Sequence, residues 1–161
     1  MAHDATQILT FYLGAEEYGL PLVQAREILG LAPTTPLPKA AKHVVGLINL
    51  RGEILPVFDL RLLFKLQSKA QQGEQDCILV AETQGESFGL KVDGMHQVLT
   101  LTADRIDPPS DALRDRSSAI SGLARVGNRL VILLDCASLF SEDEILDAGE
   151  FAEAGRSKRD A

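Results

Sequence analysis

The chain has 161 residues, of which 45% are hydrophobic and 24% are charged, values typical of a soluble globular protein that buries its own core. Its 16 Lys and Arg residues against 23 Asp and Glu give a net charge of −7, which repels phosphate backbones and anionic lipid surfaces, so we expect no nucleic-acid partner. The N-terminus lacks a secretory signal and no apolar run approaches the ~20 residues that span a bilayer, which predicts a cytoplasmic protein without direct membrane insertion.

Short runs of Val, Ile and Leu, separated by Gly and Pro, predict a mainly β fold. Residues 1–7 are expected to be a disordered N-terminus. Residues 8–13 and 16–20 predict two strands of a hairpin around Gly14-Ala15. The stretch LVQAREILG, residues 22–30, fits a helical turn followed by a strand, and propensity alone does not decide between helix and strand there.

Two polar or Pro-containing stretches separate the next apolar runs. TTPLP at 34–38 predicts an extended loop. The stretch QSKAQQGEQD, residues 67–76, has no apolar periodicity and is expected to be the joint between two halves of the chain. After it, residues 77–82 and 87–92 predict a second hairpin around Gln84-Gly85-Glu86.

The last third of the chain contains a loop and a C-terminal helix. Pro108-Pro109, within DPPSDALRDRSS, predicts a loop. Ser141 to Glu144 fits a capping box, because the Ser hydroxyl and the Glu carboxylate can satisfy the first helical N–H groups. We therefore predict a short acidic helix over 141–154, followed by a disordered tail over 155–161.

The sequence nearly repeats itself. YGLPLVQAREIL, which begins at Tyr18, aligns with FGLKVDGMHQVL, which begins at Phe88, at an offset of 70 positions. GLINLRGEILPVFDLRLLF, which begins at Gly46, aligns with GLARVGNRLVILLDCASLF, which begins at Gly122, at an offset of 76 positions. The two alignments occur in the same order, so we infer an internal duplication.

The duplication predicts two similar β units, at about 8–66 and 77–140. A unit of ~70 residues has a marginal core on its own, so the two are expected to pack along a shared seam, and whether they exchange strands stays open. Gly-rich turns and about five short strands per unit indicate small barrels, because closure removes exposed sheet edges. Short helical turns, DLRLLF and DCASLF, are expected to end the units.

A search for catalytic and metal-binding residues finds no convergent cluster. His3, His43 and His96 lack metal-ligand spacing, so we expect no metal and no cofactor.

Three other residues are candidates for chemistry. Cys77 lies in a predicted strand, which offers neither an activating base nor a helix N-terminus. Asp59 and Asp135 occupy equivalent positions in the duplication, and we interpret each as the N-cap of the helical turn that follows it. A small enzyme that uses Cys77, or Asp59 with Asp135, is kept as an alternative of a different class.

Arg51 stands with Gly52 between two aliphatic runs in GLINLRGEILPVF. One interpretation is an exposed turn residue whose guanidinium lies in solvent. The other is a guanidinium at the rim of an apolar surface, where Arg is enriched in protein interfaces. The corresponding place in the second unit is Val126-Gly127, which carries no guanidinium. This asymmetry favours a functional role for Arg51, because the fold itself does not demand the charge.

The segment GLINLRGEILPVFDLRLLF, preceded by FYLGAEEYGLPLVQAREIL and followed by GLKVDGMHQVLTL, resembles the CheW-type chemotaxis coupling domain. The likeness covers about residues 8–140. It implies two five-stranded SH3-like barrels packed on one another and no catalytic activity. It also implies a scaffold that links the cytoplasmic tips of methyl-accepting chemoreceptors to the regulatory domain of the histidine kinase CheA, in membrane-associated receptor arrays. The same scaffold in a non-flagellar pathway, such as surface motility or biofilm control, is the alternative.

The resemblance also implies two contact surfaces by position. A receptor-binding groove near the seam would contain Arg51, Met95, Val98 and Leu99. A separate kinase-binding surface on the first unit would contain Ala25, Ile28 and Gly46. Neither a receiver domain nor a kinase module follows in this sequence, which distinguishes it from other users of the same domain.

Overall fold

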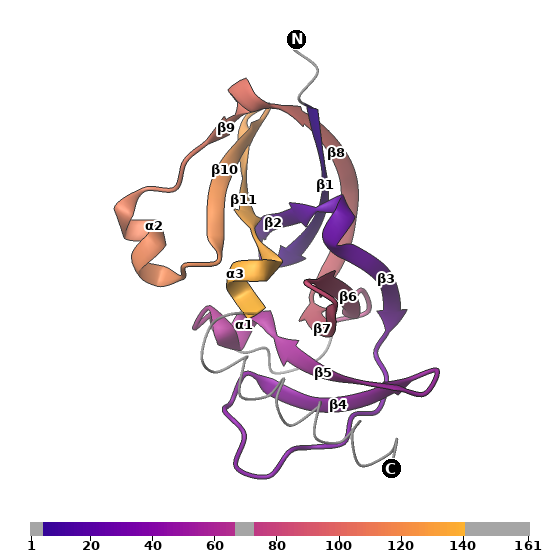
Figure 1. Ribbon diagram of the computed structural model, residues 1–161. Coiled ribbons are helices and arrows are strands. Elements are labelled where there is room, and N and C mark those ends of the chain that lie inside the picture. The colour runs from indigo at the N-terminus through magenta and orange to yellow at the C-terminus, as the bar shows by residue number, and fades with distance from the viewer. Residues whose placement is uncertain (1–4, 67–72, 141–161) are drawn as a thin grey trace.

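The computed structural model describes residues 5–66 and 73–140, which form two β-sheets with helical turns between them (Figure 1). The six-stranded sheet contains, in spatial order, β8 (Gly94–Thr102), β1 (Ala5–Leu13), β2 (Glu16–Pro21), β11 (Arg129–Leu134), β10 (Ile120–Val126) and β9 (Ile106–Asp107). The five-stranded sheet contains, in spatial order, β3 (Ala25–Gly30), β6 (Cys77–Thr83), β7 (Glu86–Val92), β5 (Glu53–Asp59) and β4 (Val44–Leu50). The helical elements are α1 (Leu60–Leu63), α2 (Asp111–Arg116), α3 (Cys136–Phe140), η1 (Leu22–Gln24) and η2 (Ala103–Arg105).

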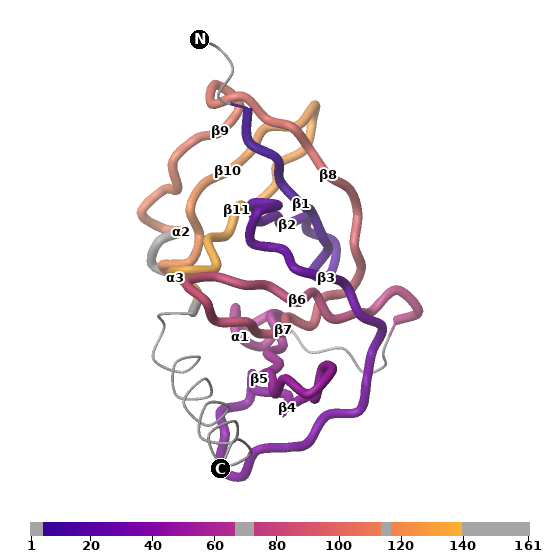
Figure 2. The backbone as a smooth tube through the Cα atoms, turned by 45° about the vertical axis from the view of Figure 1, so that its right-hand side comes forward, coloured from indigo at the N-terminus to yellow at the C-terminus, as the bar shows by residue number. Residues whose placement is uncertain are grey.

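The predicted all-β class, with two similar barrels and short helical turns, is confirmed. We call the two units the six-stranded barrel and the five-stranded barrel. Each combines strands from both halves of the sequence, because hairpin β1–β2 joins β8 to β11 and hairpin β6–β7 joins β3 to β5. The helices α1 and α3 lie between the barrels in Figure 1 and in the turned view of Figure 2. The predicted bounds of the two units, 8–66 and 77–140, describe the repeats in the sequence and stay a prediction.

The duplication is visible in the register of the two parallel strand pairs. Strand β5 runs parallel to β7 with Val57 opposite Gly89, and β11 runs parallel to β2 with Leu133 opposite Gly19. Val57 corresponds to Leu133 at the offset of 76 positions, and Gly19 corresponds to Gly89 at the offset of 70 positions, so the two residue pairs are equivalent. The two barrels therefore repeat each other in structure as well as in sequence.

Three apolar clusters hold the fold together. One fills the five-stranded barrel around Leu55 and Ile78, and a second fills the six-stranded barrel around Ile8 and Val131. The largest lies between them and draws on both sheets, with Phe11 as one of its fully buried residues. Strands that pack against the seam on one face and against a barrel interior on the other bury both faces. Their sequences are accordingly almost continuous apolar runs such as CILVA, which lack polar alternation.

The strand count and the start of the chain differ from the expectation. The sixth strand, β9, is only two residues long and pairs with β10, so its short run carried no recognisable strand pattern. Strand β1 begins at Ala5, inside the segment 1–7 that was expected to be disordered. The reason is pairing across the sheet, because Ala5 stands opposite Thr102 of β8. The residue pattern of one strand does not show which other strand will pair with it.

The helical turns follow local capping chemistry. The Asp59 carboxylate accepts a hydrogen bond from Arg61 N at 2.9 Å, and Asp135 accepts one from Ala137 N at 3.2 Å, which confirms the predicted N-caps. The loop predicted at Pro108-Pro109 is present, since residues 108–110 belong to no helix or strand. The rest of that stretch differs from the prediction, because Ser110 caps the helix α2, which begins at Asp111. The predicted helix over 141–154, the tail over 155–161 and most of the 67–76 joint lie outside the described residues.

Candidate partner-binding surfaces

Arg51 occupies the tight turn between β4 and β5 with an unusual backbone conformation. Its φ is 52° and that of Gly52 is 89°, so both central residues of the turn lie in the left-handed region. This conformation disfavours side chains with a Cβ, and the equivalent turn between β10 and β11 places Gly127 there, with φ 61°. The five-stranded barrel thus keeps an Arg where its counterpart uses the residue that the backbone prefers.

The Arg51 guanidinium makes a bidentate ion pair with Glu27 on β3. The Nη1–Oε1 distance is 3.1 Å and the Nη2–Oε2 distance is 2.5 Å. This contact lowers the pKa of the Glu27 carboxyl and raises the pKa of Arg51. The Arg51 side chain is nevertheless 64% exposed. Glu27 therefore orients the guanidinium and leaves its remaining donors open to solvent.

A second charged group surrounds Arg26 on the same strand. Its Nη1 donates to Glu53 Oε1 at 2.9 Å and to the Ser87 hydroxyl at 3.1 Å. The Ser87 hydroxyl in turn donates to Glu82 at 3.2 Å. Together with the Arg51–Glu27 pair, these residues give one end of the five-stranded barrel a surface of alternating charges.

The predicted receptor-binding residues are divided between the two barrels. Arg51 belongs to the five-stranded barrel, whereas Met95, Val98 and Leu99 lie on β8, an edge strand of the six-stranded sheet. Met95 and Leu99 are half-buried, and Val98 is 48% exposed. Among these four, Val98 and Arg51 are therefore the side chains most accessible to a partner, and they stand on different barrels.

The predicted kinase-binding residues lie on the five-stranded barrel. Ile28 on β3 is 51% exposed, whereas Ala25 packs against the seam core. At the offset of 70 positions, Ala25 and Ile28 correspond to Met95 and Val98. The two predicted surfaces thus use the same positions of the duplicated edge strands, one on each barrel.

Gly46 has a structural reason to be glycine. It lies at a β-bulge in β4 with φ 150°, and an added Cβ would stand 2.5 Å from the Thr35 carbonyl oxygen. Gly122, its equivalent in β10, lies at a similar bulge, where a Cβ would stand 2.8 Å from the Asp107 carbonyl oxygen. The close backbone approach explains both glycines without a partner. A kinase contact at Gly46 stays a prediction.

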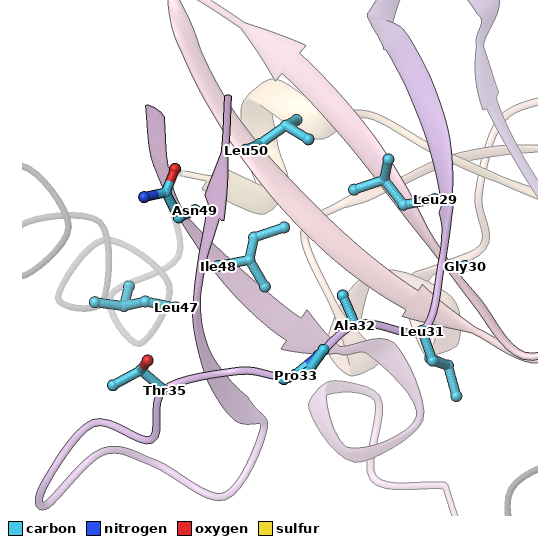
Figure 3. A pocket seen from close by; sticks show the side chains of 10 residues that line it. All are labelled: Leu29, Gly30, Leu31, Ala32, Pro33, Thr35, Leu47, Ile48, Asn49 and Leu50. Carbon is cyan, nitrogen blue, oxygen red and sulfur yellow. The ribbon is translucent and has the colours of Figure 1, made fainter. Parts of the chain in front are cut away.

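An apolar groove opens between the two edge strands of the five-stranded barrel. Its volume is about 630 Å³. Figure 3 shows Leu29, Ile48 and Leu50 pointing into the gap between β3 and β4, while Leu47 and Asn49 point away from it. Ala32 and Pro33 close one end. Because Leu50 precedes Arg51, the groove ends beside the β4–β5 turn that carries Arg51.

Sequence reasoning missed this groove and the exposed Val23 of η1. Residues such as Leu29 and Ile48 have the composition of an ordinary core strand, so no motif distinguishes a covered core from one that opens at a sheet edge. The available signal was the TTPLP stretch, because its prolines limit the pairing of this loop with β4 to one bridge, Thr35 to Leu47, and leave the rest of the edge uncovered.

The residues considered for catalysis do not form a reactive site. Burial raises the pKa of the Cys77 thiol, and burial together with the neighbouring Asp135 raises the pKa of Cys136 to about 12. Both thiols are therefore kept protonated, which makes them poor nucleophiles. Asp59 and Asp135 are engaged as caps of separate helical turns.

Within residues 5–66 and 73–140, no group of three or more His, Cys, Asp or Glu side chains could hold a metal ion. Among the described helices, none is long and apolar enough to cross a membrane.

Two packed barrels with an exposed Arg, an apolar groove and exposed apolar edge-strand residues are typical of a scaffold that binds other proteins. The family model of the CheW-like domain matches residues 7–144, so the chain belongs to the CheW-like family. A chemotaxis protein CheW of Klebsiella aerogenes is 36% identical over 144 residues, which cover 86% of this chain and 84% of the relative. These matches confirm the resemblance found in the sequence.

Two further similarities bear on structure and pathway. The solved structure of the scaffolding protein TtCheW from Thermoanaerobacter tengcongensis superposes with a TM-score of 0.80 and 28% identity, covering 87% of this chain and 95% of that one. The protein FrzA of Myxococcus xanthus is 30% identical over 111 residues, which cover 67% of this chain and 68% of the relative.

Proposed function

We propose that this protein couples methyl-accepting chemoreceptors to the histidine kinase CheA in chemosensory signalling. The observation that carries the proposal is the environment of the Arg51 side chain. This residue is held by Glu27 in a strained turn, it is mostly exposed, and it follows Leu50, which lines an apolar groove. A strained residue at a surface that the duplicated barrel builds with glycine is typical of a binding site.

The receptor contact that we propose spans both barrels. A receptor helix would lay its apolar face against β8, at Met95, Val98 and Leu99. Arg51 would hydrogen-bond carboxylate or carbonyl groups at the edge of that helix, using donors that Glu27 does not occupy. Apolar contact would then supply affinity, and the guanidinium would supply orientation.

The kinase contact that we propose lies on the five-stranded barrel. The regulatory domain of CheA would pack against Ile28 and place apolar side chains at the groove between β3 and β4. The location of the groove between the two edge strands of the sheet supports this, because an edge strand can offer backbone groups to a partner wherever no loop pairs with it, as Thr35 does with Leu47. A contact of about 600–1,000 Å² per partner would be weak alone, and many contacts in an array would supply avidity.

A matched pair of substitutions tests the two surfaces. Ile28→Asp should abolish binding to the kinase regulatory domain and keep receptor binding, whereas Val98→Asp, at the equivalent position, should do the reverse. Both side chains are exposed, so each variant should unfold within about 0.5 kcal/mol of wild type. Titration calorimetry with each partner measures the effects. Equal losses for both partners would contradict the assignment.

Arg51 has its own test and control. Arg51→Glu should abolish receptor capture in a pull-down while leaving the melting temperature nearly unchanged, since an exposed ion pair contributes little stability. Arg125→Glu makes the same charge change at an exposed Arg on β10, paired with Asp107 at 3.0 Å, and should keep receptor capture. A large fall in melting temperature for Arg51→Glu would return Arg51 to a structural role.

The same scaffold role in a non-flagellar chemosensory pathway is the second candidate. The match to FrzA, which is not named as a chemotaxis CheW, favours keeping it. Deleting the gene and scoring swimming against surface motility and biofilm formation separates the two. Loss of swimming alone supports the flagellar role, and loss of surface behaviour alone supports the second.

A further inference from the structure

Two side-chain contacts join the barrels at the places where the chain crosses between sheets. The first centres on Asp93, which lies between β7 and β8. Its carboxylate accepts hydrogen bonds from Arg61 Nη1 on α1 and from Gly14 N in the β1–β2 turn, both at 2.5 Å. One carboxylate thus ties the helical turn of the five-stranded barrel to a hairpin of the six-stranded barrel.

The second contact centres on Gln24, which ends η1 where the chain crosses in the opposite direction. Its Nε2 donates to Asp135 Oδ1 at 3.1 Å, and its Oε1 accepts from Cys136 N at 3.0 Å. The side chain therefore completes the N-cap of α3, the helix that follows the last strand of the six-stranded barrel. Helix α3 in turn packs against β6 of the five-stranded barrel.

The two contacts are placed alike in the duplicated fold. Gln24 stands one position beyond Val23, which matches Asp93 at the offset of 70 positions. Each joins a crossover segment to the helical turn that ends a barrel. We call them the Asp93 clasp and the Gln24 clasp.

The clasps are directional in a way that the seam core is not. Apolar burial between the barrels is roughly proportional to area and tolerates small rotations. Hydrogen bonds weaken steeply when their angles change. Arg61 and Asp93 are only 15% and 13% exposed, so their attraction is less screened by solvent than that of a surface pair. The clasps are thus suited to fix the angle between barrels that the core holds together.

We propose that Arg61, Asp93 and Gln24 are positioning residues that set the angle between the barrels and thereby the placement of Arg51 relative to β8. This inference rests on the proposed function, in which the receptor site spans both barrels and the kinase site lies on one. Loss of a clasp should therefore weaken receptor binding and leave kinase binding unchanged. A purely structural role would not separate the two partners in this way.

The test uses the full chain with Arg61→Gln, Gln24→Ala and the double variant. Amide residual dipolar couplings, fitted separately to the five-stranded and six-stranded barrels, measure the angle between them. Titration calorimetry with a chemoreceptor cytoplasmic fragment and with the kinase regulatory domain measures affinity. We expect a changed or averaged angle and receptor affinity lowered roughly tenfold, the size of a typical coupling between sites.

Two controls separate positioning from loss of charge or fold. Arg61→Lys keeps a cation that can reach Asp93 and should restore the angle and receptor binding. Arg125→Gln removes an exposed ion pair inside one barrel and should change neither. If a substitution at Arg61 fails to fold, Gln24→Ala alone, which removes no charge, carries the test.

The results distinguish failure of this inference from failure of the proposed function. If wild-type protein binds neither partner, the proposed function fails, and the dipolar couplings still report whether the clasps set the angle. If wild type binds both, an unchanged angle in the double variant overturns the inference. Equal weakening of receptor and kinase binding, or a changed angle with unchanged receptor binding, overturns it as well.

Discussion

The two barrels place polar side chains at equivalent positions, with an acid at the centre of one group and a base at the centre of the other. In the six-stranded barrel, Glu17 is central, with His96 Nδ1 and Arg129 Nε each 2.8 Å from its carboxylate oxygens. In the five-stranded barrel, the offsets of 70 and 76 positions put Ser87, Arg26 and Glu53 in those places. There Arg26 is central and contacts both others. The fold therefore places a group of polar side chains at this end of each barrel, and the central residue can be either an acid or a base.

The two groups differ in how deeply their charged side chains are buried. The Glu17 side chain is 4% exposed, so its partners are needed to compensate for a carboxylate removed from water. Burial acts to raise the pKa of Glu17, but hydrogen bonds from His96 and Thr10 and the charge of Arg129 hold it below its ordinary value. The Arg51–Glu27 pair beside Arg26 is more exposed. The six-stranded barrel thus buries its central charge, and the five-stranded barrel keeps Arg51 exposed to solvent.

Glu17→Ala should have the largest effect on stability. It removes two hydrogen bonds to charged or ionisable groups from a buried site, so we expect the free energy of unfolding to fall by about 3 kcal/mol. Urea denaturation measures the change. Glu16→Ala, at the exposed neighbouring position, is the matched control and should stay within about 0.5 kcal/mol of wild type. Similar losses for both variants would show that burial of Glu17 is not the cause.

The contribution of Glu17 should also depend on pH. Because its pKa in the folded protein is lowered from 4.5, the stabilisation is complete above that value and is lost as the pH falls through the folded pKa. The difference in unfolding free energy between wild type and Glu17→Ala should therefore shrink between about pH 5 and pH 2. Denaturation curves for both proteins across this range check the sign. A difference that grows toward acid would contradict the assignment.

Gly46→Ala should have the next largest effect, and it tests whether the bulges of the two barrels are under the same steric constraint. The added Cβ meets the Thr35 backbone, which has no flexible end to move, so we expect a loss of about 2 kcal/mol. Gly122→Ala should cost a similar amount in the other barrel, and Gly30→Ala, with open space around it, should not destabilise. Thermal unfolding measures all three. If Gly46→Ala instead leaves stability intact and weakens kinase binding, its role is contact.

The sequence predicts elements whose causes are local. Both hairpins follow from turns around Gly14-Ala15 and Gln84-Gly85, and both helical turns follow from caps at Asp59 and Asp135. The exchange of hairpins does not follow, because the turn that forms a hairpin carries no information about the sheet that the hairpin joins. The duplication pointed to two barrels without showing which strands close each one.

The polar contacts were beyond sequence reasoning for the same reason. Glu17 follows the exposed Glu16, and its partners His96 and Arg129 lie 79 and 112 positions away. Glu27 is 24 positions from Arg51, and only the approach of β3 to the β4–β5 turn brings them together. Arg51 itself could be singled out because the duplicated barrel supplied an internal comparison at the same turn.

Arg51→Gly should have the smallest effect on stability, and it therefore separates stability from receptor binding. Gly accepts the left-handed backbone at position 51 without strain, a gain of about 1 kcal/mol, while the exposed ion pair with Glu27 loses about 0–1 kcal/mol. The two changes oppose each other, so denaturation should report a nearly unchanged free energy of unfolding. Gly127→Arg is the reverse exchange, and its cost in the other barrel should be about 1 kcal/mol, since the equivalent of Glu27 there is the uncharged Gln97. If Arg51→Gly loses receptor binding at constant stability, the strain in this turn is retained for the partner rather than for the fold.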